Sequence, residues 1–315
     1  MLRLIVRRLL LMIPTLLAVS VLVFGLSEIL PGDVGRTILG PYATPEQVKL
    51  LDHQLGADRP LVQRYVTWLE HFVTGNWGTS QVLQEDVFSL VMGRLGNSLL
   101  LAAIALIIIV PTSIILGVVA GVRQDGIVDR TITVVTLSLT VIPEFVSGAI
   151  LLVLLAVAVH VFPVTAAAPP GASFGTRIYY LILPSIPLMF IELGYIARMA
   201  RAGTVEALAM PYVRTAILKG LPKSRVILRH VLRNAMVPTV TVIGAQVGWL
   251  VGGLVVVETL FSYPGLGSLM VQAAIGHDVL VLEASVMVFA FLYMLSNLTA
   301  DVAVAALSPR ARRGG

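Results

Sequence analysis

Six acidic residues lie within or beside long apolar stretches of the chain. They are Glu28, Glu144, Glu192, Glu258, Glu283 and Asp301. A carboxylate in an apolar stretch is costly unless it faces protein or water, so each of these residues is by default a functional candidate. Glu144 follows Pro143, and Glu192 follows Pro184 and Pro187, so both lie near expected helix irregularities. Glu144 and Glu192 are therefore candidates either for a polar pathway or for helix packing.

Motifs for other chemistry are missing from the sequence. There is no Gly-x-x-x-x-Gly-Lys-Ser/Thr loop for nucleotide phosphates, no His-Glu-x-x-His and no Gly-x-Ser-x-Gly. The chain has no cysteine, and its five histidines lack the spacing of metal ligands on one helical face. Ser27 with His160 leaves an intramembrane hydrolase as an alternative, although a serine there usually bonds to a helix carbonyl. We expect no catalytic residue, no metal site and no cofactor bound by this chain.

The apolar stretches that carry these residues are long enough to cross a bilayer. The chain is 57% hydrophobic and 12% charged, with a mean hydropathy of +0.93, and a spanning helix needs about 20 apolar residues. The sequence therefore predicts an all-α integral membrane protein with about six transmembrane helices. The expected spans are 9–30, 98–122, 134–161, 178–197, 235–257 and 279–307. The first is too long for a signal peptide, and we expect it to be retained.

The basic residues predict the orientation of these spans. Most of the 22 Lys and Arg residues fall in segments that are cytoplasmic if the N-terminus is inside, and the largest such segment is 199–234. We therefore expect both termini in the cytoplasm. The net charge of +5 is then a topology signal, with contact to the lipid bilayer second, and it does not indicate nucleic-acid binding.

The segment 31–95 between the first two spans contains residues typical of helix starts and ends, which predict a folded, helical insertion outside the membrane. Thr44, Pro45 and Gln47 form a capping box with proline at the first helical position, and Gly56 is placed to end that helix. A second helix is expected from Pro60 to Gly75. It carries an apolar stripe that favours a small core over a ligand site, formed by Leu61, Tyr65, Trp68, Leu69 and Phe72.

The cytoplasmic segment 199–234 divides at Gly220-Leu221-Pro222. Before the break, Pro211 suits the first turn of a short helix and Gly220 suits a left-handed cap after it. Tyr212, Ala216 and Lys219 then share one face of that helix. After the break, Ser224 is expected to cap a second, surface-lying helix with a line of arginines, Arg225, Arg229 and Arg233.

A ridge of small residues marks the fifth expected span. Gly244, Gly248 and Gly252 recur at four-residue intervals and allow another helix to approach closely. The pattern fits packing within the chain or against a partner.

Four groups of segments resemble the permeases of ABC importers, in the dipeptide, oligopeptide and nickel branch, and the resemblance covers nearly the whole chain. They are 7–14 with 30–33, 55–61 with 75–80, 212–238, and 257–267 with 277–278, followed by a similar closing segment at 306–310. The chain departs from the family's pattern at Asn76, Arg214, Ile217 and Ser308.

The resemblance implies a type I ABC importer permease architecture and a role for two loops. The first is an element that couples to the ATPases, carried over to Pro211, Tyr212, Arg214, Thr215, Ala216, Lys219 and Gly220. The second is an external gate or loop that contacts a binding protein or a partner permease, or instead braces the fold, carried over to Glu258, Phe261, Pro264, Gly265 and Gly267.

The resemblance also implies partners and a location. A second homologous permease, two cytoplasmic ATPases that carry ATP and Mg, and an extracytoplasmic solute-binding protein would complete the importer in a bacterial or archaeal cytoplasmic membrane. The expected substrate is a dipeptide or oligopeptide, with a nickel chelate or a glutathione-like solute as alternatives. The rival hypothesis is a six-helix ion-coupled secondary carrier.

These expectations divide the chain into four parts. They are an N-terminal segment with the first span at 1–30, the insertion at 31–95, the core permease domain at 96–309 with its coupling loop at 199–234, and a cytoplasmic tail at 310–315.

Overall fold

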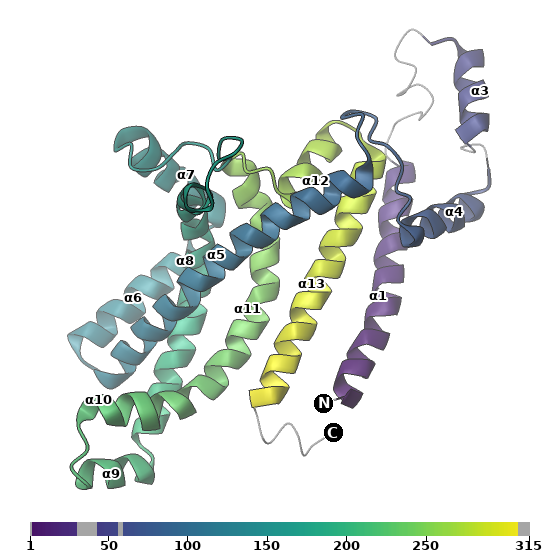
Figure 1. Ribbon diagram of the computed structural model, residues 1–315. Helices are drawn as coiled ribbons and strands as arrows, with labels where there is room; N and C mark the ends of the chain where they lie inside the picture. The colour runs from purple at the N-terminus through teal and green to yellow at the C-terminus, as the bar shows by residue number, and fades with distance from the viewer. Residues whose placement is uncertain (1, 30–42, 56–58, 308–315) are drawn as a thin grey trace. The chain divides into compact units, whose positions relative to one another are not determined.

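The computed structural model describes residues 2–29, 43–55 and 59–307, and these residues are nearly all helical (Figure 1). Among the described residues, five helices are long and apolar enough to cross a membrane, and one bent pair of shorter helices passes the same test together, which gives up to six spans. The expectation of about six spans is therefore confirmed. The predicted cap at Gly56, the segment 30–33, the closing residues 308–310 and the tail 310–315 lie outside the described residues.

The spans begin and end as follows. They are α1 (Leu2–Ile29), α5 (Val87–Val122), α6 (Ile127–Val141) followed by α7 (Glu144–Leu151) and the π-helical segment η1 (Leu152–Ala158), α8 (Phe174–Leu208), α11 (Leu232–Leu260) and α13 (Val279–Leu307).

The third expected span, 134–161, is not a straight helix. The chain bends by 103° between α6 and α7. Ile142 leaves the helical region, with φ −80° and ψ 120°, directly before Pro143. A residue before proline is disfavoured in the helical conformation, and proline itself has no N–H to continue the helix. The bend therefore follows from the sequence at this point.

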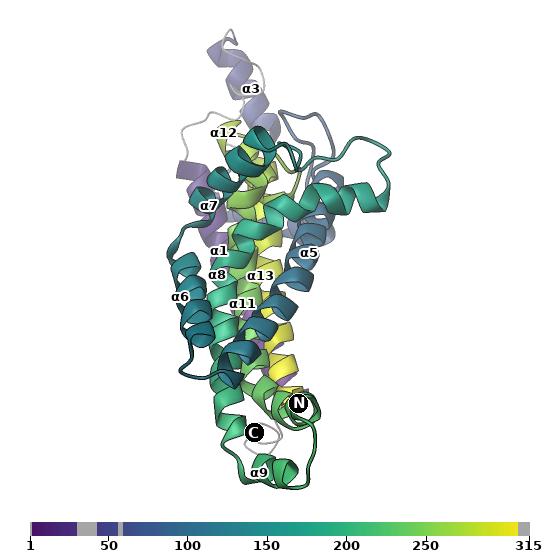
Figure 2. The same cartoon turned by 90° about the vertical axis from the view of Figure 1, so that its left-hand side faces the viewer.

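The chain divides into two compact units. The first comprises Met1–Arg8, Ser98–Pro264 and Leu292–Gly315, and the second comprises Leu9–Asn97 and Gly265–Phe291. In the first unit, α8 packs against both α6 and α11, and Figure 2 shows the three helices side by side. An apolar core that includes Leu101, Leu181, Leu254 and Phe261 fills this unit.

The second unit has its own apolar core. Besides parts of α1, α5 and α13 it contains α3 (Pro45–Leu55), α4 (Leu61–Thr74) and α12 (Leu266–Ile275). A chain of aromatic rings with centroids 5.0 to 6.1 Å apart links α1 to α4 and the residues after it: Phe24, Tyr65, Trp68, Phe72 and Trp77. The apolar stripe of α4 therefore belongs to a small core.

The helix signals of the predicted insertion are confirmed where the structure describes them. The backbone N–H of Thr44 donates to Gln47 Oε1 at 3.0 Å, and the N–H of Gln47 donates to Thr44 Oγ1 at 3.3 Å, which completes the capping box. The second helix ends at Gly75, whose φ of +80° is a left-handed cap. The helix α12, by contrast, lies where the sequence analysis placed only a loop.

The segment after the Gly220 break differs from its prediction. A short helix α9 (Pro211–Leu218) is followed by α10 (Lys223–Arg225) and the π-helical segment η2 (Val226–Val231). From Lys223 to Leu260 the chain is one helix. Pro222 occupies the N-cap, so the prediction of a Ser224 cap is wrong. Proline fits the start of a helix because its fixed φ suits that position.

Candidate functional site

Helix α9 is a short helix with well-defined ends. Pro211 occupies its first turn, where a missing N–H costs nothing. Gly220 has φ +73°, as the sequence predicts for a left-handed cap. The N–H of Gly220 donates to the carbonyl of Ile217 at 2.9 Å, and the N–H of Leu221 donates to the carbonyl of Ala216 at 3.3 Å. These two bonds are a Schellman motif, which ends the helix and turns the chain back.

One face of α9 is buried in a small core of its own. Val213 and Ala216 pack with Ala207 of α8 and with Val226, Val231 and Ala235 of the following helix. Ala216 is 5% exposed whereas Tyr212 and Lys219 are exposed, so the prediction that the three share one face of the helix is wrong. Its small side chain lets α9 lie close to its neighbours. Ala216 therefore supports the helix and does not offer a contact surface.

The other face of α9 is exposed. Of the predicted coupling residues, Pro211, Tyr212, Arg214, Thr215, Lys219 and Gly220 are exposed. The sequence analysis missed two apolar residues at the tip, Ile217 and Leu218, whose side chains are 58% and 79% exposed. The signal for them was present, because two large apolar residues close to the glycine cap of a short helix in a polar segment have no local core to enter. Such an exposed apolar tip is typical of a surface that meets another protein.

Tyr212 connects α9 to the long helix that follows. Asn234 donates from Nδ2 to the Tyr212 hydroxyl at 2.7 Å and to the carbonyl of His230 at 3.1 Å. In Figure 1, α9 lies beyond the ends of α8 and α11, at the same end of the first unit as the start of α1. Tyr212 therefore ties α9 to the start of the long helix that follows it.

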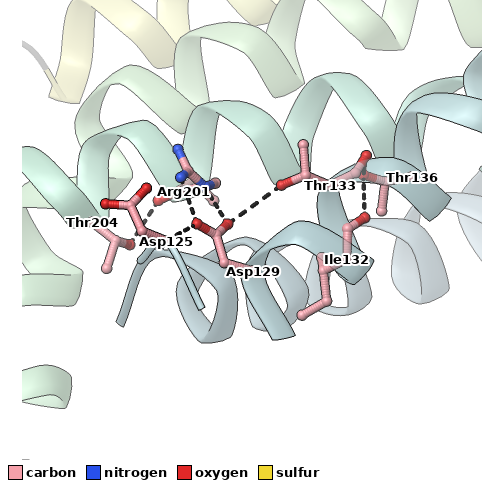
Figure 3. A network of polar contacts seen from close by, with 8 residues as sticks. Asp125, Asp129, Ile132, Thr133, Thr136, Arg201 and Thr204 are labelled. Carbon is pink, nitrogen blue, oxygen red and sulfur yellow. Dashed lines mark hydrogen bonds and ion pairs between the residues drawn. The ribbon is translucent and has the colours of Figure 1, made fainter. Parts of the chain in front are cut away.

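An ion pair joins α8 to the start of α6, as Figure 3 shows. Arg201 donates from Nε to Asp129 Oδ1 at 2.5 Å and from an Nη to Asp129 Oδ2 at 2.6 Å. Asp129 also accepts the backbone N–H of Asp125 at 2.9 Å and the hydroxyl of Thr133 at 3.4 Å. The sequence analysis did not single out this pair. Its partners are 72 positions apart, so no local pattern indicates them.

The predicted gate residues are mostly buried. Glu258 is 0% exposed and accepts a hydrogen bond from the Ser98 hydroxyl at 2.5 Å, and Phe261 is 1% exposed within the core of the first unit. Gly265 and Gly267 are buried and begin α12. The burial of Glu258 and Phe261 favours the bracing alternative over direct contact for these two side chains. Pro264 is half-buried.

The turn after α11 is held by its backbone. The N–H of Tyr263 donates to the carbonyl of Glu258 at 2.8 Å, and Ser262, with φ +51°, is the exposed residue between them. Burial, together with the negative charge of Glu258, raises the pKa of the Tyr263 hydroxyl to about 12. This phenol stays protonated at all physiological pH values, so it acts as a fixed polar group.

Two of the three ridge glycines pack within the chain. A Cβ at Gly244 would lie 2.8 Å from Cβ of Ala300, and one at Gly248 would lie 3.0 Å from Oδ1 of Asn297, both on α13. Gly252 has open space around its Cα. The ridge therefore serves α11–α13 packing at its first two positions.

Four of the six acidic membrane residues have partners in the structure. Asp301 pairs with Arg8 at 3.0 Å and Glu28 pairs with Arg64 at 2.5 Å. Glu283 accepts the Ser27 hydroxyl at 2.5 Å, and Glu258 accepts that of Ser98. Ser27 also bonds to the carbonyl of Phe24 at 2.8 Å, as expected for a serine in a spanning helix.

The remaining two acidic residues are brought together. Glu192 of α8 is 4% exposed, and Gln246 of α11 and Glu144 at the start of α7 are its polar neighbours. Neither carboxylate belongs to an ion pair between described residues. The sequence analysis named both residues but had no means to show that they meet.

Comparisons with known proteins agree with this architecture. Residues 113–313 match the family described as "Binding-protein-dependent transport system inner membrane component", and residues 1–102 match the N-terminal family of the same membrane components. The chain is 36% identical over 312 residues to the "Glutathione transport system permease protein GsiC" of Escherichia coli strain K12, covering 99% of both chains. The proteins of that name from Shigella dysenteriae serotype 1 and Salmonella choleraesuis are equally similar. The chain thus belongs to the binding-protein-dependent inner-membrane transport components, the permease subunits of ABC importers.

Proposed function

We propose that this permease forms half of an import pathway for short peptides or glutathione-like solutes. The observation that carries the proposal is its likeness, over 99% of its length, to glutathione permeases. Glutathione is itself a small peptide, so this likeness fits the peptide branch and brings the glutathione-like alternative to the same level as dipeptides. An ion-coupled secondary carrier has no support in the family to which the chain belongs.

The exposed face of α9 is the proposed contact with the ATPases. A permease without a nucleotide loop must take work from a partner, and α9 offers a rigid helix with Tyr212, Ile217 and Leu218 on its surface. Helix α9 is packed on α8 and on the start of the long helix that begins at Lys223. A rigid-body shift of α9 would therefore move both helices. The partner ATPase chains would then bind ATP and Mg and hydrolyse the ATP.

The complete importer would contain a second homologous permease, two ATPases and a solute-binding protein, in a bacterial or archaeal cytoplasmic membrane with both termini of this chain inside. In the turn after α11, the proposed contacts with the binding protein are the exposed Ser262 and the half-buried Pro264. The insertion at 31–95 would be outside.

Reconstitution of the complete importer in proteoliposomes tests the proposal. We expect ATP-driven uptake that requires the binding protein, with glutathione or dipeptides as substrate and stimulation of ATP hydrolysis by the loaded binding protein. Uptake of neither solute, or uptake driven by an ion gradient without ATP, would contradict it.

A further inference from the structure

The carboxylate of Glu192 lacks a complete set of partners. Three mutually packed helices, α7, α8 and α11, meet around it in the first unit. The side chain is 4% exposed, Gln246 is its polar neighbour, and its Oε2 has no hydrogen-bond partner among the described residues. A buried polar atom without a partner costs free energy, and such atoms in native proteins call for an explanation.

A second carboxylate increases this cost. Glu144, which is half-buried, lies within electrostatic range of Glu192, and two like charges at this range repel each other. The ion pairs between described residues include neither of them. A cation bound between the two carboxylates would relieve both the repulsion and the burial of an unpartnered oxygen.

The surroundings favour an ammonium group over a metal ion. Calcium needs about six to eight oxygen ligands, and the described residues contain no cluster of three or more metal-binding side chains. An ammonium has three donors, which two carboxylates and the amide oxygen of Gln246 would satisfy. Gly253 keeps the α11 backbone close, since a Cβ there would lie 3.4 Å from Oε1 of Glu144 and 3.0 Å from Leu188.

We propose that Glu144, Glu192 and Gln246 form a subsite for the ammonium group of the transported solute. The inference rests on the proposed function, because peptides and glutathione carry such a group. It assigns one recognition step to the permease itself, in addition to any made by the binding protein. The neutral variants Glu144→Gln and Glu192→Gln keep the shape of the site and remove its charge.

Binding to the purified complex tests the subsite directly. The complex of both permeases and both ATPases, without the binding protein, is equilibrated with glutathione or with glutaryl-cysteinyl-glycine, which is glutathione without its ammonium group. We expect the unaltered complex to prefer glutathione by about tenfold or more, as for loss of a buried charge pair. Glu144→Gln and Glu192→Gln should each bring the ratio close to one. Glu206→Gln, at an exposed position on the same helix, should leave the ratio unchanged.

The outcomes separate the two proposals. The importer could take up glutathione while both glutamine variants keep the preference for glutathione over glutaryl-cysteinyl-glycine that the unaltered complex has. In that case the subsite is wrong and the proposed function stands. The subsite is also wrong if the unaltered complex shows no preference, or if both variants weaken the two solutes equally, as bracing or proton sharing would. An importer that takes up neither glutathione nor dipeptides contradicts the proposed function and the subsite together.

Discussion

Arg201 and Asp129 join α8 to α6 through two parallel charge-assisted hydrogen bonds, 2.5 and 2.6 Å long. The Asp129 side chain is 4% exposed and that of Arg201 is 30% exposed. Planar guanidinium and carboxylate groups match in this geometry, which fixes orientation as well as distance. Arg201 lies in the last turns of α8, the helix that leads into α9, so the pair fixes this end of α8 against α6.

Arg201→Met should destabilise the permease by about 3–5 kcal/mol, because it leaves a buried carboxylate without its cation. Arg201→Lys should cost less, since it keeps the charge but loses the paired geometry. Thermal unfolding of the purified protein measures both. Arg198→Met is the control, as Arg198 is exposed on the same helix and lies over the Tyr195 ring. Equal melting temperatures for the Arg201 and Arg198 variants would contradict the prediction.

Gly220→Val should uncouple the importer. A β-branched residue at φ +73° strains the turn by about 1 kcal/mol or more and reorients α9. We expect folded permease in the membrane with reduced co-purification of the ATPases or with ATP hydrolysis that no longer drives uptake. Gly220→Asn is the matched control, because asparagine tolerates the left-handed region. Full transport by the valine variant would show that the cap does not position the helix for its partner.

Phe261→Ala should act on stability and not selectively on binding-protein docking. The ring is 1% exposed, and truncation of a buried phenylalanine costs about 3–5 kcal/mol. Thermal unfolding and a docking assay on the same preparation separate the two effects. Ser262→Ala, at the neighbouring exposed position, should leave stability unchanged. A stable Phe261→Ala permease that fails only in docking would restore the direct-contact interpretation.

Gly244→Val and Gly252→Val should differ although they are two turns apart on one helix. The first forces a side chain against Ala300, where even a Cβ would lie at 2.8 Å, and overpacking of this kind costs about 1–3 kcal/mol. The second enters open space. The melting temperature of the isolated permease is the measurement. Equal effects would mean that the α11–α13 contact does not require the small residue.

The orientation can be tested with single cysteines, because the chain has none of its own. A cysteine at Lys49, exposed on α3, should react with a membrane-impermeant thiol reagent in intact cells. A cysteine at Arg214, exposed on α9, should react only after lysis. The reverse pattern would invert the topology.

Local signals were enough to predict many of the elements. The capping box at Thr44, the end of a helix at Gly75, the left-handed Gly220 and the apolar lengths of the spans depend on residues close together in sequence. Pro143 also indicated the bend between α6 and α7, although the angle between these two helices depends on packing against other helices.

Features that join distant segments were not predictable in this way. The buried Glu258 accepts a hydrogen bond from Ser98, which is 160 positions away, and the resemblance to a family loop gave no sign of this contact. Likewise, the meeting of Glu144 with Glu192 requires the bend before α7 to be formed first. The sequence analysis identified these residues as candidates, but their contacts became known only from the tertiary structure.

The division of the chain into two units has a consequence for biosynthesis. Each unit takes residues from the last helix: α13 contributes 279–291 to one and 292–307 to the other, and Asp301 pairs with Arg8 near the start of the chain. Neither unit is complete until the final helix has left the ribosome and entered the membrane. The earlier helices can pack on one another before then, as α6, α8 and α11 do, but the contacts that need α13 form only at the end of translation.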